Sequence, residues 1–144
     1  MSAPSYSGAI ETVAITADAD IIEARRRLRT LAEHLPYSSA ELAMVATAIS
    51  ELARNILVYA TSGEIELSLV DDRRRFGIQV IARDNGPGIT DIDLAMQDGY
   101  SSSRGLGLGL PGSRRLVDEF EIESHVGIGT TVTLTKWAAR TGQS

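Results

Sequence analysis

A run of alternating glycine and leucine, GLGLGLPG at residues 105–112, constrains the fold more than any other part of the chain. Glycine at every second position leaves backbone N–H groups open to the close approach that a polyphosphate requires. The leucines between these glycines need an apolar surface, so the run must lie against a core. Upstream, residues 84–88 read DNGPG, which places a carboxylate at a glycine-containing turn. Together the two segments predict a nucleotide site.

The composition is typical of one globular domain spanning residues 1–144. A chain of 144 residues is long enough for a single core, and 43% hydrophobic with 23% charged residues is ordinary. A net charge of −5 disfavours a nucleic-acid partner. No apolar run approaches the roughly 20 residues that span a bilayer, so we expect no membrane partner. The lack of cysteine excludes disulfides and thiolate metal sites, and it suits the reducing cytoplasm.

Lysine is nearly missing from the chain, which excludes two large classes of nucleotide enzyme. Lys136 is the only lysine, and it stands next to Trp137 near the C-terminus. A P-loop NTPase needs a lysine in its glycine loop, and a eukaryotic-type protein kinase needs one on an early strand. The phosphates must therefore be held by backbone amides, a metal and arginine.

Hydrophobic periodicity and capping signals predict the order of the elements. Asp18 or Asp20 caps a first helix that Pro36 ends, and Ser38 with Glu41 forms a capping box for a second helix that Gly63 closes. A third helix is expected at 108–119, and strands at 9–16, 64–70, 76–83, 120–126 and 130–137. Because hairpins dominate the second half, this order favours an α+β fold. We expect a two-layer α/β sandwich, with helices on one face of a mixed, mostly antiparallel sheet.

Glu51 and Asn55 stand one turn apart on the second predicted helix, on the flank of its apolar stripe. An amide oxygen and a carboxylate in that arrangement suit Mg²⁺, with the Asn ligating and the Glu orienting or deprotonating a nucleophile. An ordinary polar flank of an amphipathic helix gives the same pattern, so the pair alone does not decide between the two.

Asp84 follows a predicted strand directly. A carboxylate there can accept a hydrogen bond from the exocyclic amine of adenine, whereas guanine presents a carbonyl that would repel it. Gly86 and Gly88 let the chain turn sharply past the base. The alternative is an ordinary Asp-Asn-Gly turn. Thr130, which enters the last predicted strand, either reaches the adenine through water or is simply a favourable strand residue.

The glycine run contains a dinucleotide-type spacing at Gly107, Gly109 and Gly112, but it precedes the last helix and an antiparallel hairpin rather than opening a βαβ unit. That fingerprint is therefore a false positive. Phosphates cradled at the start of the helix predicted at 108–119 are the physical interpretation. Arg104, just before the run, adds positive charge.

In order along the chain, Glu51-x-x-x-Asn55, Asp84-x-Gly86-x-Gly88, the glycine run and Gly129-Thr130 resemble the motifs of the GHKL (Bergerat-fold) ATPases. The resemblance covers nearly the whole chain. It implies that Asn55 ligates Mg²⁺ on ATP, that Glu51 is the general base, and that Asp84 binds adenine. It also implies a mobile ATP lid at 91–104 and closure over the phosphates by Gly105, Gly107, Leu108 and Gly109. Arg104 departs from the small residue expected there.

The longer runs ARDNGPGI, DGYS and GLPG with DEF look specifically like the switch kinases of stressosome signalling. With 144 residues there is no room for the extra domains of gyrase, Hsp90 or histidine kinases, so we expect a free-standing protein kinase. The resemblance implies a serine or threonine acceptor on a STAS-domain scaffold or antagonist protein. It also implies that the released kinase activates a PP2C-type phosphatase. The alternatives are an anti-sigma factor kinase that sequesters a sigma subunit, and a nucleotide-binding adaptor without turnover. Glu51 and Asn55 argue against the adaptor, which needs no base.

Overall fold

The computed structural model describes residues 5–6, 10–72, 75–89, 92–97 and 109–138. Its strands are β1 (Ser5–Tyr6), β2 (Glu11–Ile15), β3 (Gly63–Asp71), β4 (Phe76–Asp84), β5 (Glu119–His125) and β6 (Gly129–Trp137). Its helices are α1 (Asp18–Leu31), α2 (Ser39–Tyr59), α3 (Ile92–Ala95) and α4 (Gly109–Arg115).

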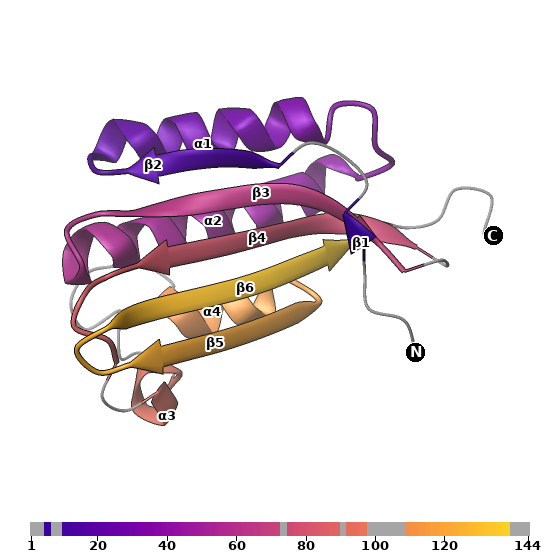
Figure 1. Ribbon diagram of the computed structural model, residues 1–144. Coiled ribbons are helices and arrows are strands. Elements are labelled where there is room, and N and C mark those ends of the chain that lie inside the picture. Colours follow the sequence, from indigo (N-terminus) through magenta and orange to yellow (C-terminus); the bar gives the residue numbers. More distant parts are fainter. Residues whose placement is uncertain (1–4, 7–9, 73–74, 90–91, 98–108, 139–144) are drawn as a thin grey trace.

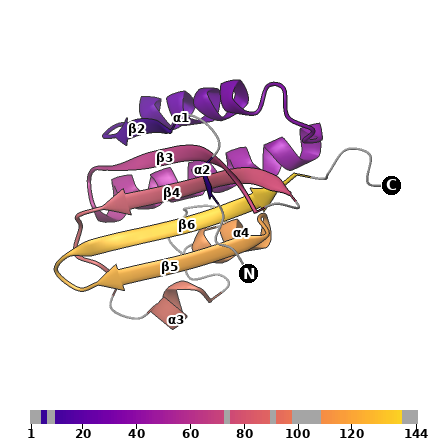
Figure 2. The same cartoon turned by 45° about the vertical axis from the view of Figure 1, so that its right-hand side comes forward.

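The strands form one sheet in the order β1-β3-β4-β6-β5, and β2 also pairs with β3. β2 pairs with residues 63–67 of β3, while β1 pairs with Val70 and Asp71 at its other end. Every described pairing is antiparallel. Helices α1, α2 and α4 lie together on one face of the sheet (Figure 1, Figure 2). The predicted α+β sandwich, with helices on one face, is therefore confirmed.

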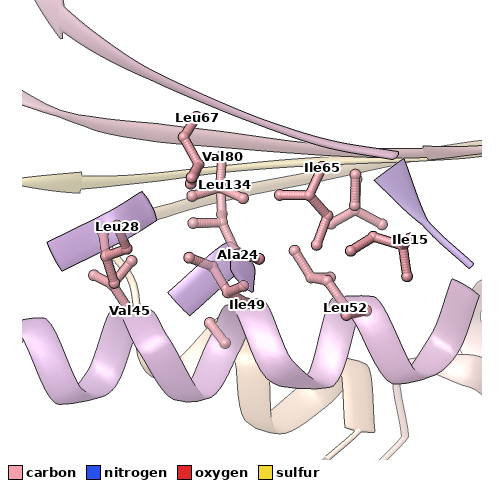
Figure 3. Packing of buried hydrophobic residues seen from close by; sticks show 14 of the residues in the cluster. Ile15, Ala24, Leu28, Val45, Ile49, Leu52, Ile65, Leu67, Val80 and Leu134 are labelled. Atoms are coloured by element: carbon pink, nitrogen blue, oxygen red, sulfur yellow. The ribbon is translucent and has the colours of Figure 1, made fainter. Parts of the chain in front are cut away.

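The core lies between α2 and the sheet. Alternate residues of the strands point toward the helices, as the period of two in a strand requires, and α2 packs between α1 and α4. Figure 3 shows Ile49 and Leu52 of α2 facing Ile65 of β3 and Leu134 of β6. All four side chains are at most 1% exposed. This packing holds the strand ends and the flank of α2 in fixed relation to each other.

Helix α2 is more apolar than inspection of the sequence indicated. Its 21 residues contain an 18-residue window of mean hydropathy 1.3, enough by length and composition to cross a membrane. In the fold, 44% of that window is buried against the rest of the domain. Packing in the domain core accounts for its apolar character.

Three predicted boundaries are wrong, and at two of them, Gly63 and the end of α4, tertiary contacts override local signals. α1 stops at Leu31, before Pro36. At the start of α1, the carboxylate of Asp20 lies in the first turn and accepts from the N–H groups of Thr16 and Ala17. α2 stops at Tyr59, and Gly63 opens β3 instead of closing the helix. A Cβ on Gly63 would lie 2.3 Å from the carbonyl oxygen of Arg83, so the glycine is required by strand pairing.

The third error concerns α4, which ends at Arg115 instead of residue 119. The N–H of Asp118 donates to the carbonyl oxygen of Thr135 at 3.0 Å, so the chain has already joined the sheet there. Sheet pairing ends this helix early. The two closing strands otherwise lie within a residue of their predicted positions.

Tyr37, in the connection between α1 and α2, joins the helix layer to the sheet. Its hydroxyl accepts from the N–H of Ile78 at 2.9 Å and donates to the carbonyl oxygen of Lys136 at 2.5 Å. Burial raises the pKa of the Tyr37 hydroxyl far above its usual value, so it stays a donor at every physiological pH.

Candidate nucleotide site

A cavity of about 80 Å³ opens between the C-terminal half of α2 and the adjoining ends of β4 and β6. Its walls are mostly apolar, as a flat heteroaromatic ring requires, with a few polar groups among them. The lining residues are Leu52, Asn55, Ile56, Tyr59, Ala82, Asp84, Ile89, Ala95, Leu110, Thr130 and Val132.

Asp84 is held at the wall of this cavity by two backbone donors. Its Oδ1 accepts from the N–H of Gly86 at 2.9 Å and from the N–H of Thr130 at 3.3 Å. No described residue donates to its other oxygen, Oδ2. The carboxylate is therefore oriented by the protein and keeps an acceptor available, which fits an exocyclic amine of adenine.

The turn after Asp84 is fastened to neighbouring elements on both sides. A Cβ on Gly86 would lie 2.6 Å from the Cβ of Ala60, so the turn packs directly on the end of α2. Gly88 has φ of +81°, and its Cβ would lie 2.5 Å from the carbonyl oxygen of His125. On that side, the N–H of Gly127 donates to the carbonyl oxygen of Pro87 at 2.7 Å. Both glycines are needed for close approach.

Thr130 and Ser124 complete the wall on the side of the β5–β6 hairpin. Their hydroxyl oxygens are 2.7 Å apart, and the Ser124 hydroxyl also accepts from the N–H of Ile89 at 2.7 Å. The Thr130 hydroxyl thus belongs to a polar network beside Asp84, which places it where a bridging water could connect it to a base.

Glu51 is buried, although its position on the helix flank suggested partial exposure. The residue is only 6% exposed. Its Oε1 accepts from the N–H of Gly109, the first residue of α4, at 3.2 Å, and its Oε2 lies 3.4 Å from Nη1 of Arg54. The carboxylate therefore sits between the start of α4 and an arginine on its own helix.

Asn55 lines the cavity one turn beyond Glu51, and its side-chain nitrogen Nδ2 is buried without a hydrogen-bond partner among the described residues. A buried amide without a partner is costly, so this side chain is suited to a ligand's polar groups. With an amide oxygen and a nearby carboxylate, the donor set fits a hard cation bound to phosphate oxygens.

The structure brings together six of the predicted site residues from four separate parts of the chain: Glu51, Asn55, Asp84, Gly86, Gly109 and Thr130. Gly88 does not line the cavity; it packs the turn against the carbonyl oxygen of His125. Arg104, Gly105, Gly107 and Leu108 lie outside the described residues, as does most of the predicted lid at 91–104.

Sequence inspection missed Arg54 and the apolar walls of the cavity. The signal for Arg54 was its i,i+3 spacing from Glu51, which places oppositely charged side chains next to each other on a helix. No comparable signal exists for Tyr59 or Ile89, because only the fold brings them to the same cavity.

Comparison with known proteins agrees with this geometry. Residues 41–140 match the family described as histidine kinase-, DNA gyrase B- and HSP90-like ATPases. The chain is 48% identical over 125 residues to the serine/threonine-protein kinase RsbT of Bacillus subtilis (strain 168), a match covering 87% of this chain and 94% of RsbT. It is 31% identical over 123 residues to an anti-sigma F factor of Caldanaerobacter subterraneus subsp. tengcongensis, covering 81% of this chain and 85% of that factor.

A crystal structure of the RsbU and RsbW domains of a Mycobacterium tuberculosis protein has a similar fold, with a TM-score of 0.58 and 21% identity. That match covers 88% of this chain and 32% of the longer chain, and at this identity it shows the fold alone.

The chain therefore belongs to the family of histidine kinase-, gyrase- and HSP90-like ATPases, the GHKL family that its motifs resemble. Within that family, the similarity to RsbT over most of both chains confirms the predicted enzyme class, an ATP-using protein kinase.

Proposed function

We propose that this chain is a serine/threonine kinase that transfers phosphate from Mg²⁺-ATP to a STAS-domain scaffold or antagonist protein in the cytoplasm. The observation that carries the proposal is the arrangement of Glu51, Asn55 and Asp84. A buried carboxylate and an unpartnered amide stand one turn apart on α2, and a second carboxylate faces the same cavity from the end of β4. An enzyme that activates an attacking hydroxyl, holds a phosphate-bound metal and binds adenine needs these three groups, respectively.

Each of these residues has a separate task. Asp84 accepts the adenine amine and rejects the guanine carbonyl. Asn55 would hold Mg²⁺ through its side-chain oxygen, and Mg²⁺ supplies charge neutralisation of the phosphates. Glu51 takes the proton of the acceptor hydroxyl as that oxygen attacks. Gly105 and Gly107, which precede α4 in the sequence, are proposed to offer their N–H groups to the phosphates.

The similarity to RsbT, which is stronger than the similarity to the anti-sigma F factor, supports the proposal of these partners over a sigma subunit. A phosphate added to the STAS-domain protein carries about −1.5 to −2 charge at pH 7 and disrupts docking of the kinase. The released kinase then binds and activates a PP2C-type phosphatase. No nucleic acid or membrane takes part.

The second candidate is an anti-sigma factor that sequesters a sigma subunit and phosphorylates its antagonist. The 31% identity with an anti-sigma F factor favours this alternative over other classes. Co-purification from the native cell separates the two, because one predicts a phosphatase bound to the chain and the other predicts a sigma subunit.

Transfer of labelled phosphate from ATP to purified STAS-domain proteins tests the proposal directly. We expect Glu51→Gln to keep the Kd for ATP within about twofold and to lower the transfer rate at least about 100-fold, because only the base is lost. Glu33→Gln, on the exposed residue beyond α1, is the matched control and should transfer at the wild-type rate. Equal transfer by Glu51→Gln would remove Glu51 from the role of base.

A further inference from the structure

Arg54 lies beside Glu51 on α2, and nothing in the proposed function uses it. We propose that Arg54 contacts the transferred phosphoryl group and stabilises the negative charge on its oxygens during transfer. This inference rests on the proposed kinase function. It assigns to α2 a second catalytic residue, located on the opposite side of Glu51 from Asn55.

The geometry of α2 places Glu51 between two groups of different chemistry. With 100° per residue, Asn55 lies about 40° to one side of Glu51 and Arg54 about 60° to the other. Asn55 lines the base cavity, whereas Arg54 faces solvent with 47% of its side chain exposed. The carboxylate between them is 7% exposed. A phosphoryl group that extends from the cavity toward Glu51 therefore comes within reach of the guanidinium.

Arg54 keeps donors available for that contact. Among the described residues, its contact with Glu51 uses Nη1 alone and is long, at 3.4 Å. A guanidinium carries five N–H donors in a planar fork that matches phosphate oxygens. The Glu51 carboxylate orients this fork without occupying it, and the N–H of Gly109 holds the other carboxylate oxygen at 3.2 Å.

Three other cations of the described chain, Lys136, Arg83 and Arg75, are placed elsewhere. Lys136 is six residues along β6 from Thr130, about 20 Å away at the rise of a strand, and its Nζ lies 3.8 Å from Asp118. Arg83 contacts Glu64 and Glu66 on β3, and Arg75 stacks on Trp137. Arg54 is the cationic side chain that contacts the proposed base.

The transfer step balances without any further reactant. The acceptor oxygen forms a bond to the γ-phosphorus as the bond from that phosphorus to the bridging oxygen of ADP breaks. The acceptor proton passes to the Glu51 carboxylate, and ADP leaves with the bond electrons. Arg54 forms and breaks no covalent bond; its N–H groups donate to the non-bridging oxygens, where charge is concentrated in the transition state.

The test compares Arg54→Ala, Arg54→Lys and the control Arg25→Ala, which removes an exposed arginine of α1. We expect Arg54→Ala to lower the single-turnover rate of transfer to a STAS-domain protein at least about 100-fold, as for other arginines that contact the phosphoryl group. The Kd for ATP should change less than about threefold. Arg54→Lys should recover about tenfold of the lost rate, and Arg25→Ala should match the wild type.

A second measurement separates contact with phosphate from mere support of Glu51. ADP with Mg²⁺ and aluminium fluoride mimics the planar phosphoryl group, so Arg54→Ala should bind this complex at least about 30-fold more weakly and bind ADP normally. Glu51→Gln should bind both about as the wild type does. Circular dichroism checks that each variant is folded.

The outcomes are distinct. If the wild type transfers phosphate and Arg54→Ala transfers at an equal rate, or binds the aluminium fluoride complex with unchanged affinity, the role of Arg54 is overturned and the kinase function stands. If the wild type transfers phosphate to no STAS-domain protein, the proposed function is overturned, and this inference with it.

Discussion

Asp84 is the residue that connects the cavity to the rest of the molecule. One of its carboxylate oxygens ties together the turn at Gly86 and the start of β6 at Thr130. Its other oxygen accepts from no described residue and so stays available to a ligand. A single side chain thus both builds the wall of the cavity and supplies the proposed contact with the base.

Replacing Asp84 with Asn tests that double role. The amide has one acceptor oxygen instead of two, so it either keeps the backbone contacts or receives the adenine amine. Loss of a hydrogen bond to a charged group costs about 1.5–3 kcal/mol, which corresponds to a rise in the Kd for ATP of roughly 10- to 100-fold. Isothermal titration calorimetry measures the Kd for ATP of both proteins. Asp18→Asn, on the exposed first turn of α1, is the control, and an unaltered Kd in Asp84→Asn would contradict the adenine contact.

The β5–β6 hairpin and the turn at residues 85–89 form one unit, because the N–H of Gly127 donates to the carbonyl oxygen of Pro87 and the N–H of Ile89 donates to the Ser124 hydroxyl. Gly129 marks the tightest point, where a Cβ would lie 2.1 Å from the carbonyl oxygen of Asp84. The geometry of the base pocket therefore depends on a glycine that touches no ligand.

Two glycines of this hairpin form a matched pair for a stability measurement. Gly127 and Gly129 have φ of +81° and +148°, but a Cβ on Gly127 meets nothing within 4 Å. We expect Gly127→Ala to lower the free energy of unfolding by about 1–2 kcal/mol, the cost of the backbone conformation alone. Gly129→Ala should cost clearly more, since β4 and β6 must also separate. Urea unfolding measures both, and equal losses would show that the contact with Asp84 has no role.

Helix α1 carries a charge cluster on its exposed side. Glu23 accepts from Nε of Arg26 at 2.9 Å and from Nε of Arg27 at 2.7 Å, and Arg27 also reaches Glu11 of β2 at 2.6 Å. Hydrogen bonds first from Arg26 and then from Arg27 lower the pKa of the Glu23 carboxyl from 4.5 to about 2.

This shift predicts how the stability of α1 depends on pH. Because the folded-state pKa lies below the unfolded one, the ionised Glu23 stabilises the fold above pH 4.5, and this contribution is lost as the pH falls toward 2. We expect Glu23→Gln to be less stable than the wild type at neutral pH, with the difference disappearing near pH 2. Unfolding by urea across this range measures it. Glu33→Gln serves as the control, and a difference independent of pH would contradict the prediction.

The described residues form one sandwich, and the cavity proposed to bind the nucleotide lies between its layers. Its walls come from α2 on one side and from β4 and β6 on the other, so a ligand in the cavity contacts both layers. Binding should therefore stabilise the entire fold and not only one loop.

Ligand-dependent unfolding tests this coupling. At a concentration 100 times its Kd, a ligand that binds only the folded chain adds about 2.7 kcal/mol, which raises Tm by roughly 5–10 °C for a domain of this size. We expect that rise with Mg²⁺-ATP, a much smaller rise with EDTA present, and none with Mg²⁺-GTP. Thermal unfolding by circular dichroism measures it. Equal stabilisation by ATP and GTP would contradict base selection by Asp84.

Local signals in the chain were sufficient for the order of the elements other than β1 and α3, and for the polar residues around the cavity. The capping box at Ser38 and Glu41 places the start of α2, and the spacing of Glu51 and Asn55 puts both on one flank of it. These features act over three or four residues, where helix geometry alone relates one side chain to the next. For the same reason, alternation along each strand was enough to predict the two hairpins.

Contacts between segments distant in the sequence determined the features that depend on two elements, such as where a strand begins, where a helix ends and which side chain is buried. Gly63 opens a strand because Arg83 lies against it, and α4 ends early because Asp118 has joined β6. Glu51 is buried because the start of α4 covers it, and Gly109, which donates to it, is 58 positions later in the chain. A one-dimensional pattern carries no record of which surface will cover a side chain, and the packing of the two layers decides that.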